Sequence, residues 1–151
     1  MKPFKNLFAA FLLVIFAFTF TSKAFAADKT VKVGNNYAIK SEDKKSNPKM
    51  VNETVTVKKN PQKVVVYDLG ALDTITALGK EKNVVAIPKS QHGLNMLNKD
   101  MKKIYSAKKY QNAGSLFEPD FETIAKLQPD LIIISGRSAT SKNIEELKKA
   151  A

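Results

Sequence analysis

Three apolar, β-branched runs in this sequence each end beside a side chain that could bind a ligand. Tyr67 closes the first run, Lys89 follows the second and Arg137 follows the third; the runs are Lys63–Tyr67, Asn83–Ile87 and Leu131–Ser135. Such runs are typical of buried strands, and open parallel sheets bind ligands at the carboxyl ends of their strands. Arginine pairs with anionic oxygens, so Arg137 is the first candidate for a ligand contact and Lys89 the second. The alternative for Arg137 is a surface arginine that bonds only nearby carbonyl groups.

Two aromatic side chains are further candidates for lining a cleft. Tyr67 lies at the end of its apolar run, and Phe117 lies in a short segment before the next helical pattern. Aromatic side chains beside strands are more often part of the core, because their large apolar surface favours burial. Both interpretations stay open for Tyr67 and Phe117.

The sequence offers little for catalysis or for a resident metal. It contains no cysteine and a single histidine, His92, so a zinc site of the cysteine and histidine type has too few ligands. No Gly-x-Ser-x-Gly elbow and no phosphate-binding glycine loop is present, and Ser135–Ser138 resembles an elbow only superficially. We therefore expect neither an enzyme nor a cofactor, and no catalytic or metal-binding residue is assigned.

The first 26 residues have the features of a secretory signal peptide. A basic start is followed by the apolar stretch Leu7–Phe20 and by the small residues of Ala24–Ala26. The apolar stretch is shorter than the roughly 20 residues that a spanning helix needs, so cleavage before Ala27 is favoured over a membrane anchor.

The chain is strongly basic, with a formal net charge of +11. In a cytosolic protein such a charge would suggest nucleic acid, but export argues against that partner, and the lysines are scattered. They form either a solvated surface or a field that favours anionic solutes.

The exported part divides into a polar lead-in and one α/β domain. Residues 27–52 are polar and weakly patterned, and we expect a flexible segment with at most a short strand near Val31–Val33. Residues 53–151 then alternate strands with helices, which implies parallel strands with crossovers and a three-layer α/β sandwich.

The expected elements are an edge strand at Thr54–Val57, the three apolar runs, and helices at Leu69–Leu78, Gly93–Tyr105, Phe121–Leu127 and from about Ser141. Asp68 should cap the first helix and Gly79 end it, Pro119 should stand at a first helical position, and Ile144 and Leu147 should face inward.

Several motifs in order resemble the N-terminal lobe of iron-siderophore and cobalamin-type periplasmic binding proteins. They are Asn60–Asp68, Leu72–Gly79, Gly114–Glu122 and Ile124–Arg137, the last being the most specific. With Tyr110–Gly114, they look like the branch that binds catecholate siderophores. The resemblance implies the helical-backbone binding-protein fold, a monomer, and a ferric siderophore as the ligand.

The same resemblance assigns roles to two residues. It implies that Arg137 points into the cleft, where it would join basic residues of a second lobe around the anionic ferric complex. It also implies that Glu122 docks into a basic pocket of an ABC permease dimer in the inner membrane. Without the family, Glu122 is an ordinary glutamate in the first turn of a helix, where the helix dipole favours a negative charge.

The sequence departs from the family in two ways. The cleavage site lacks the cysteine of a lipoprotein, which favours a soluble periplasmic form, and the chain stops inside the helix after the third strand. We therefore expect a fragment or a truncated product that carries only one lobe. The alternatives are a binding protein for haem, cobalamin or another iron chelate, a secreted lysine-rich interaction module and, third, an exported enzyme.

Overall fold

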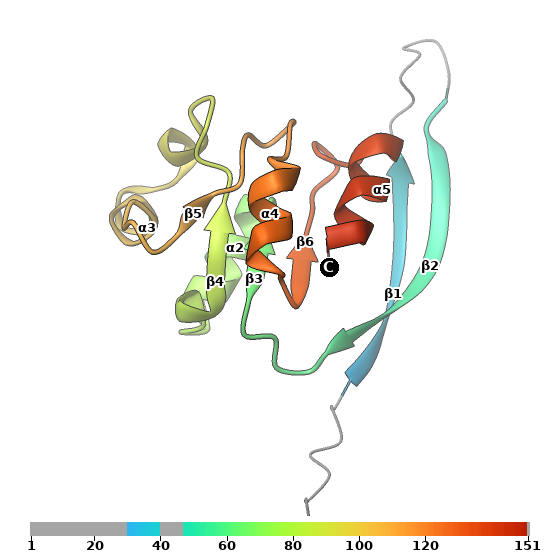
Figure 1. Ribbon diagram of the computed structural model, residues 1–151, viewed down its shortest axis with the longest axis horizontal. Helices are drawn as coiled ribbons and strands as arrows, with labels where there is room; N and C mark the ends of the chain where they lie inside the picture. The colour runs from blue at the N-terminus through green and yellow to red at the C-terminus, as the bar shows by residue number, and fades with distance from the viewer. Residues whose placement is uncertain (1–29, 40–46, 151) are drawn as a thin grey trace, which may run out of the picture.

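The computed structural model describes residues 30–39 and 47–150. A β-hairpin comes first, formed by β1 (Thr30–Ile39) and β2 (Lys49–Lys58), and a layered α/β lobe follows it (Figure 1). The predicted signal peptide, residues 1–26, lies outside the described residues, as does part of the predicted lead-in.

The lobe is built on a four-stranded sheet in the order β5-β4-β3-β6. The strands are β3 (Val64–Val66), β4 (Val84–Ile87), β5 (Gln111–Asn112) and β6 (Leu131–Ile133), and every pairing among them is parallel. The three strands expected from apolar runs are confirmed, and all three residues of β3, which lies between β4 and β6, are buried. The fourth strand, β5, was not expected, because two exposed polar residues carry no apolar pattern.

Helices cover both faces of this sheet, which confirms the three-layer α/β sandwich. On one face Val64 and Val66 pack with Leu72 of α2 (Leu69–Ala77) and Met101 of α3 (Lys99–Tyr105). On the other, Val65 packs with residues of α4 (Phe121–Leu127) and α5 (Ser141–Ala150), which lie in front of the sheet in Figure 1. Successive valines of β3 thus serve opposite cores, as the alternation of a strand requires.

The ends of the helices follow the local chemistry of the sequence. Asp68 caps α2 by accepting a hydrogen bond from the Ala71 N–H at 2.8 Å, and Gly79 follows with a positive φ of 66°, both as expected. The expected helix from Gly93 is divided into a 3-10 turn, η2 (Gly93–Met96), and α3; the Asn98 side chain caps α3. A second short 3-10 turn, η1 (Glu81–Asn83), leads into β4.

Pro119 does not stand at a first helical position. The residue after it, Asp120, is the N-cap of α4 and accepts a hydrogen bond from the Thr123 N–H at 3.0 Å. Aspartate is one of the preferred N-cap residues because its carboxylate satisfies a free N–H group of the first turn, so α4 begins at Phe121, two residues after Pro119.

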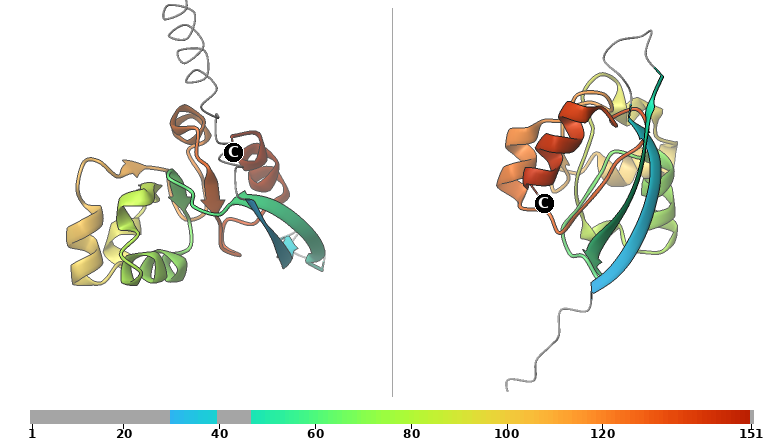
Figure 2. Two further views of the ribbon diagram at one scale, coloured as in Figure 1. Left: turned by 90° about the horizontal axis from the view of Figure 1, so that it is seen from below. Right: turned by 90° about the vertical axis from the view of Figure 1, so that its right-hand side faces the viewer.

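The hairpin corrects the expected flexible lead-in. Both strands have ten residues and pair in one antiparallel register from Thr30↔Lys58 to Ile39↔Lys49. The short strand expected near Val31–Val33 and the edge strand expected at Thr54–Val57 are therefore two halves of one longer unit. Figure 2 shows it beside α5, where Lys148 Nζ forms a 2.8 Å ion pair with Glu53.

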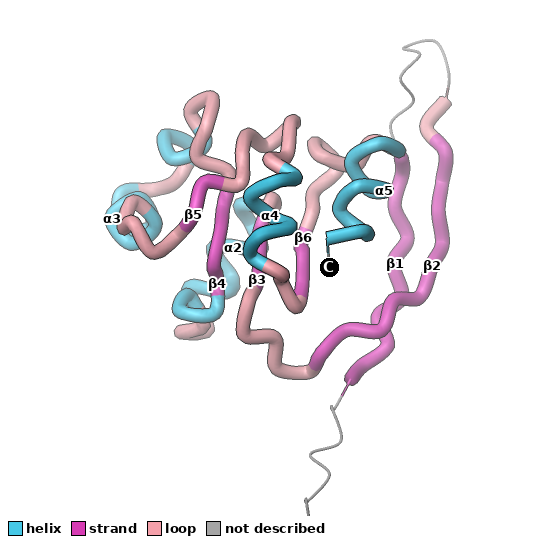
Figure 3. Tube along the Cα trace, in the orientation of Figure 1, coloured by secondary structure: helices cyan, strands magenta, loops and turns pink. Residues whose placement is uncertain are grey.

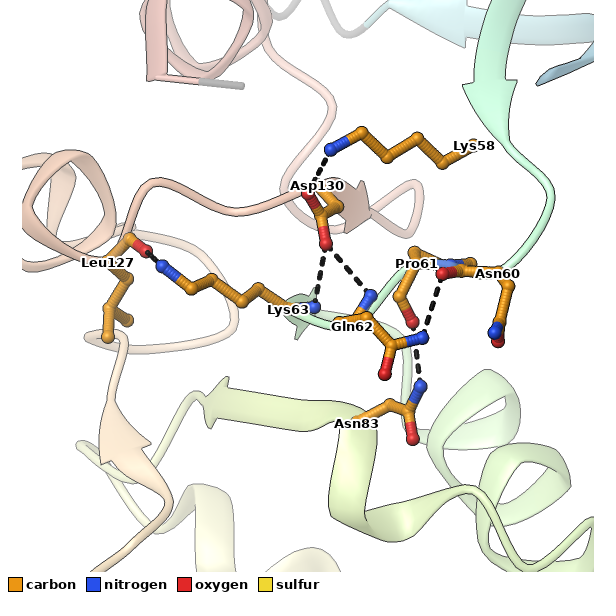
Figure 4. A network of polar contacts seen from close by, with 8 residues as sticks. All are labelled: Lys58, Asn60, Pro61, Gln62, Lys63, Asn83, Leu127 and Asp130. Atoms are coloured by element: carbon orange, nitrogen blue, oxygen red, sulfur yellow. Dashed lines mark hydrogen bonds and ion pairs between the residues drawn. The ribbon is translucent and has the colours of Figure 1, made fainter. Parts of the chain in front are cut away.

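A network around Asp130 joins the hairpin to the amino edge of the sheet (Figure 4). The Asp130 carboxylate accepts hydrogen bonds from Lys58 Nζ at 2.7 Å, from the Gln62 N–H at 2.8 Å and from the Lys63 N–H at 3.1 Å. Lys58 ends β2, Gln62 and Lys63 lead into β3, and Asp130 immediately precedes β6. These bonds hold the pKa of Asp130 down at about 2, the Lys58 bond having the largest effect.

Candidate ligand-binding edge

The loops that follow the parallel strands lie along one edge of the sheet, the upper edge in Figures 1 and 3. Arg137 stands in the loop after β6 and is exposed. Its own N–H donates to Ser135 Oγ at 3.3 Å, while the buried Ser138 donates to the Ser135 carbonyl from both its N–H and its hydroxyl, at 3.1 and 3.2 Å. The turn is thus held by its serines, and among the described residues no side chain forms an ion pair with the exposed Arg137.

Phe117 stands in the loop after β5, and 56% of it is exposed. The backbone around it is fixed by the buried Ser115, whose hydroxyl accepts hydrogen bonds from the Phe117 N–H at 3.3 Å and the Glu118 N–H at 3.0 Å. A large apolar ring on a fixed loop at this edge suits contact with a planar or aromatic part of a ligand.

Lys89 stands in the loop after β4 and is half-buried. Its N–H donates to Asn112 Oδ1 at 3.0 Å, and its ammonium group donates to the Ala107 carbonyl at 3.4 Å. Desolvation by burial lowers the pKa of Lys89. Lys89 is therefore partly engaged by its own protein, and Arg137 is the better-presented cation.

Tyr67 is not at the surface of this edge. It is fully buried, its ring packs with Ile124 and Leu147, and its hydroxyl donates a hydrogen bond to the Ala113 carbonyl. Burial raises the pKa of Tyr67 well above that of a free phenol. Tyr67 is a core residue in this structure, so its assignment as a ligand contact is corrected; its indirect role is to hold Ala113, which leads into the Phe117 loop.

Glu122 stands in the first turn of α4, with a side chain that is 79% exposed. It accepts a 2.5 Å hydrogen bond from Lys126 Nζ, one helical turn later. A pair this exposed is easily separated by water or by a partner's cation. The carboxylate is therefore accessible from solvent, and nothing in its local geometry distinguishes it from other surface glutamates.

The role of three polar residues that order this edge was not predicted from the sequence. Asn112 joins the loops after β4 and β5, Ser115 holds the Phe117 loop, and Asn143 of α5 reaches two loops at once. Single asparagines and serines produce no periodic pattern, so their contacts could not be predicted from the sequence. The available local signal is Thr140, which accepts a hydrogen bond from the Asn143 N–H at 3.1 Å and marks the start of α5.

Residues 30–39 and 47–150 contain neither a metal-binding cluster nor a membrane-spanning helix. No group of three or more histidine, cysteine or carboxylate side chains is arranged to hold a metal ion in this part of the chain. Within the same residues, no helix has the length and apolar character required to span a bilayer.

Comparison with known proteins identifies the family. Residues 64–151 match the model of the periplasmic binding proteins, which is more than half of the chain. The chain belongs to the periplasmic binding protein family. The resemblance drawn from the motifs at Asn60–Asp68 and Ile124–Arg137 is thereby confirmed.

Among its relatives, this binding protein is 46% identical over 95 residues to the petrobactin-binding protein YclQ of Bacillus subtilis, covering 63% of this chain and 27% of YclQ. The crystal structure of YclQ aligns with a TM-score of 0.56 at 40% identity, over 78% of this chain and 36% of that one. The catecholate-siderophore binding protein VctP of Vibrio cholerae aligns with a TM-score of 0.53 at 39% identity, over 78% and 36%. The Fe(3+)-citrate-binding protein YfmC of Bacillus subtilis is 33% identical over 121 residues, 78% of this chain and 35% of YfmC. The chain thus spans about a third of the length of these relatives.

Proposed function

We propose that this chain forms the N-terminal lobe of a solute-binding protein that captures a ferric siderophore of the catecholate type for an ABC importer. The observation that carries the proposal is Arg137, an exposed guanidinium on a serine-held turn at the carboxyl edge of the parallel sheet. Phe117 on the neighbouring loop adds an exposed aromatic surface. A ferric tris-catecholate is anionic and aromatic, so it suits a cation and a ring rather than a metal-binding cluster.

The relatives support the same ligand class. Two of those compared are named for petrobactin or catecholate siderophore binding, and a third for ferric citrate. Ferric citrate is also an anion, but it has no aromatic ring to use Phe117. Haem and cobalamin remain alternatives within the same fold.

A titration of ligands tests the proposal directly. The binding protein that carries this lobe together with its second lobe is purified from the periplasm of a bacterial host and titrated by calorimetry with ferric tris-catecholate, ferric citrate, haem and cobalamin. We expect the catecholate complex to bind most tightly, and Arg137→Ala to weaken it by about tenfold or more because a charge-assisted contact is lost. Lys89→Ala is the matched control and should have a smaller effect. Binding of ferric citrate alone would reassign the ligand, and no binding of any of the four would refute the proposal.

Docking on the permease is proposed separately, for Glu122. In a strain that depends on this protein for uptake of ferric siderophore, Glu122→Lys should reduce uptake while leaving siderophore affinity unchanged. Glu145→Lys, which reverses an exposed charge on α5, is the control for a general effect of charge. Equal uptake by the two variants would argue against docking on the permease through Glu122.

Export through a cleaved signal peptide completes the proposed function. The basic start, the apolar stretch and the small residues at Ala24–Ala26 support it. Mass spectrometry of the protein from the periplasm should give a chain that begins at Ala27. A chain that retains residues 1–26 and remains with the membrane would instead indicate an anchor.

A further inference from the structure

Asn143 lies where two loops of the candidate site meet α5. It is 7% exposed, although its carboxamide is polar. Its Nδ2 group donates to the Phe117 carbonyl at 3.1 Å and to the Ser138 carbonyl at 3.0 Å. One side chain therefore bonds the loop that follows β5 and the loop that follows β6, which are 26 and 5 residues away in the chain.

These two loops carry the two exposed side chains of the site. The bonded carbonyl of the first loop belongs to Phe117 itself, and that of the second belongs to Ser138, the neighbour of Arg137. The strands β5 and β6 lie at opposite ends of the sheet order β5-β4-β3-β6, so strand pairing does not join their loops directly. Asn143 of α5 connects them on the face of the sheet that α4 and α5 cover.

We propose that Asn143 is a positioning residue that fixes Phe117 and Arg137 relative to each other and so sets the geometry of the ligand edge. The consequence for ligand affinity rests on the proposed function, whereas the link between the loops does not. A carboxamide suits this role because its NH₂ group has two donors, one for each carbonyl, and needs no charge in a buried place. Leucine or alanine would leave both carbonyls without this partner, at the cost that a buried unsatisfied group carries.

The link is tested first without any ligand, by amide hydrogen exchange in the full chain. The reporters are the Glu118 N–H and the Ser138 N–H, one in each loop, both hydrogen-bonded. The Tyr67 N–H, which bonds the Ile133 carbonyl at 2.7 Å, reports on the core. In Asn143→Leu and Asn143→Ala we expect the exchange rate to increase at both loop reporters. This increase should be about tenfold larger than any increase at the core reporter.

The control variant is Ile144→Val, on the next residue of α5, which is 9% exposed. It removes buried apolar contact and keeps both donors of Asn143. It should alter exchange at all three reporters together. If Asn143→Leu and Asn143→Ala also change the three together, or change only one loop, the link is overturned.

Affinity is then measured with gallium(III) tris-catecholate, a diamagnetic substitute for the ferric complex. We expect the dissociation constant of the Asn143 variants to rise about tenfold, and that of Ile144→Val to stay near the original value. Original affinity in folded Asn143 variants would overturn the positioning role and leave the proposed function standing. If the unaltered two-lobed protein binds no catecholate, the proposed function fails, and the exchange experiment alone decides whether Asn143 joins the loops.

Discussion

Both edges of the parallel sheet contain a cation and polar side chains, but the cation has an anionic partner at one edge and is exposed at the other. At the amino edge, Asp130 accepts hydrogen bonds from Lys58 and from the backbone of Gln62 and Lys63, so the cation there already has an anionic partner. At the carboxyl edge, serines and asparagines hold the backbone of the loops, while Arg137 remains exposed.

This difference separates stability from recognition. A carboxylate that pairs with a lysine and two N–H groups fixes where the hairpin and two strands begin, and it leaves nothing for a ligand. Neutral side chains that bond only backbone groups can order a loop without neutralising the cation on it. The comparison therefore predicts that substitutions at the amino edge change stability alone, and that those at the carboxyl edge also change binding.

The largest effect is expected from a pair of glycines, one near each edge. Gly114, before the Phe117 loop, has a φ of 94°, and a Cβ there would lie 2.5 Å from the Glu118 carbonyl oxygen and 2.7 Å from the Asp120 nitrogen. Gly79, after α2, also has a positive φ, but a Cβ there meets nothing within 4 Å. Gly114→Ala should therefore lower the free energy of unfolding by about 3 kcal/mol or more, and Gly79→Ala by about 1 kcal/mol.

Urea unfolding followed by circular dichroism measures both glycine variants. Siderophore affinity, measured under conditions where both variants are folded, should fall only for Gly114→Ala. Equal losses of stability would mean that the loop after β5 adapts easily to a Cβ at residue 114. That result would contradict the description of this loop as fixed.

The sequence was sufficient for most of the lobe because its signals are local. The β-branched runs at Val64–Val66 and Leu131–Ile133, the cap at Asp68 and the glycine at Gly79 each need only neighbouring residues to be interpreted. Arg137 was also found in this way, because it follows directly after an apolar run. The structure places Arg137 in the loop after β6, where it is exposed.

The remaining features depend on contacts between distant residues. The β1–β2 hairpin was missed because its strands carry polar residues on one face, and only their pairing, for example Val33↔Val55, gathers the valines on the other. The sequence left Tyr67 open between the core and the cleft, and only its packing in the folded chain places it in the core. Asn143 bonds a carbonyl 26 residues away, and no local pattern could indicate that partner.

A smaller effect is expected from Asp130→Ala at the amino edge. The variant removes the acceptor of three hydrogen bonds, but the donors are exposed enough for water to replace it. We therefore expect a loss of only about 1 kcal/mol in the free energy of unfolding and no change in siderophore affinity. Asp73→Ala, on the exposed side of α2, is the control. A change in affinity for Asp130→Ala would show that the two edges are coupled through the strands.

The smallest effect concerns the pH dependence of stability. The folded protein lowers the pKa of Asp130 from 3.8 to about 2, chiefly through the Lys58 hydrogen bond, and it lowers the pKa of Asp120, chiefly through the Thr123 N–H. Because both pKa values are lowered on folding, each carboxylate contributes stability above about pH 4, and Asp130 loses its contribution as the pH falls towards 2.

Asp130→Asn and Asp120→Asn divide this acid dependence between the two edges. Asparagine cannot ionise but still accepts a hydrogen bond, so each variant should be less stable than the original protein at pH 5 and approach it at pH 2. The gap at pH 5 should be larger for Asp130→Asn, because a lysine partner is lost there, whereas Asp120 still caps α4 as asparagine. Urea midpoints between pH 2 and pH 5 measure both gaps. If the gap is the larger one for Asp120→Asn, the carboxyl edge also depends on a fixed charge, and the contrast between a paired edge and a neutrally held edge is wrong.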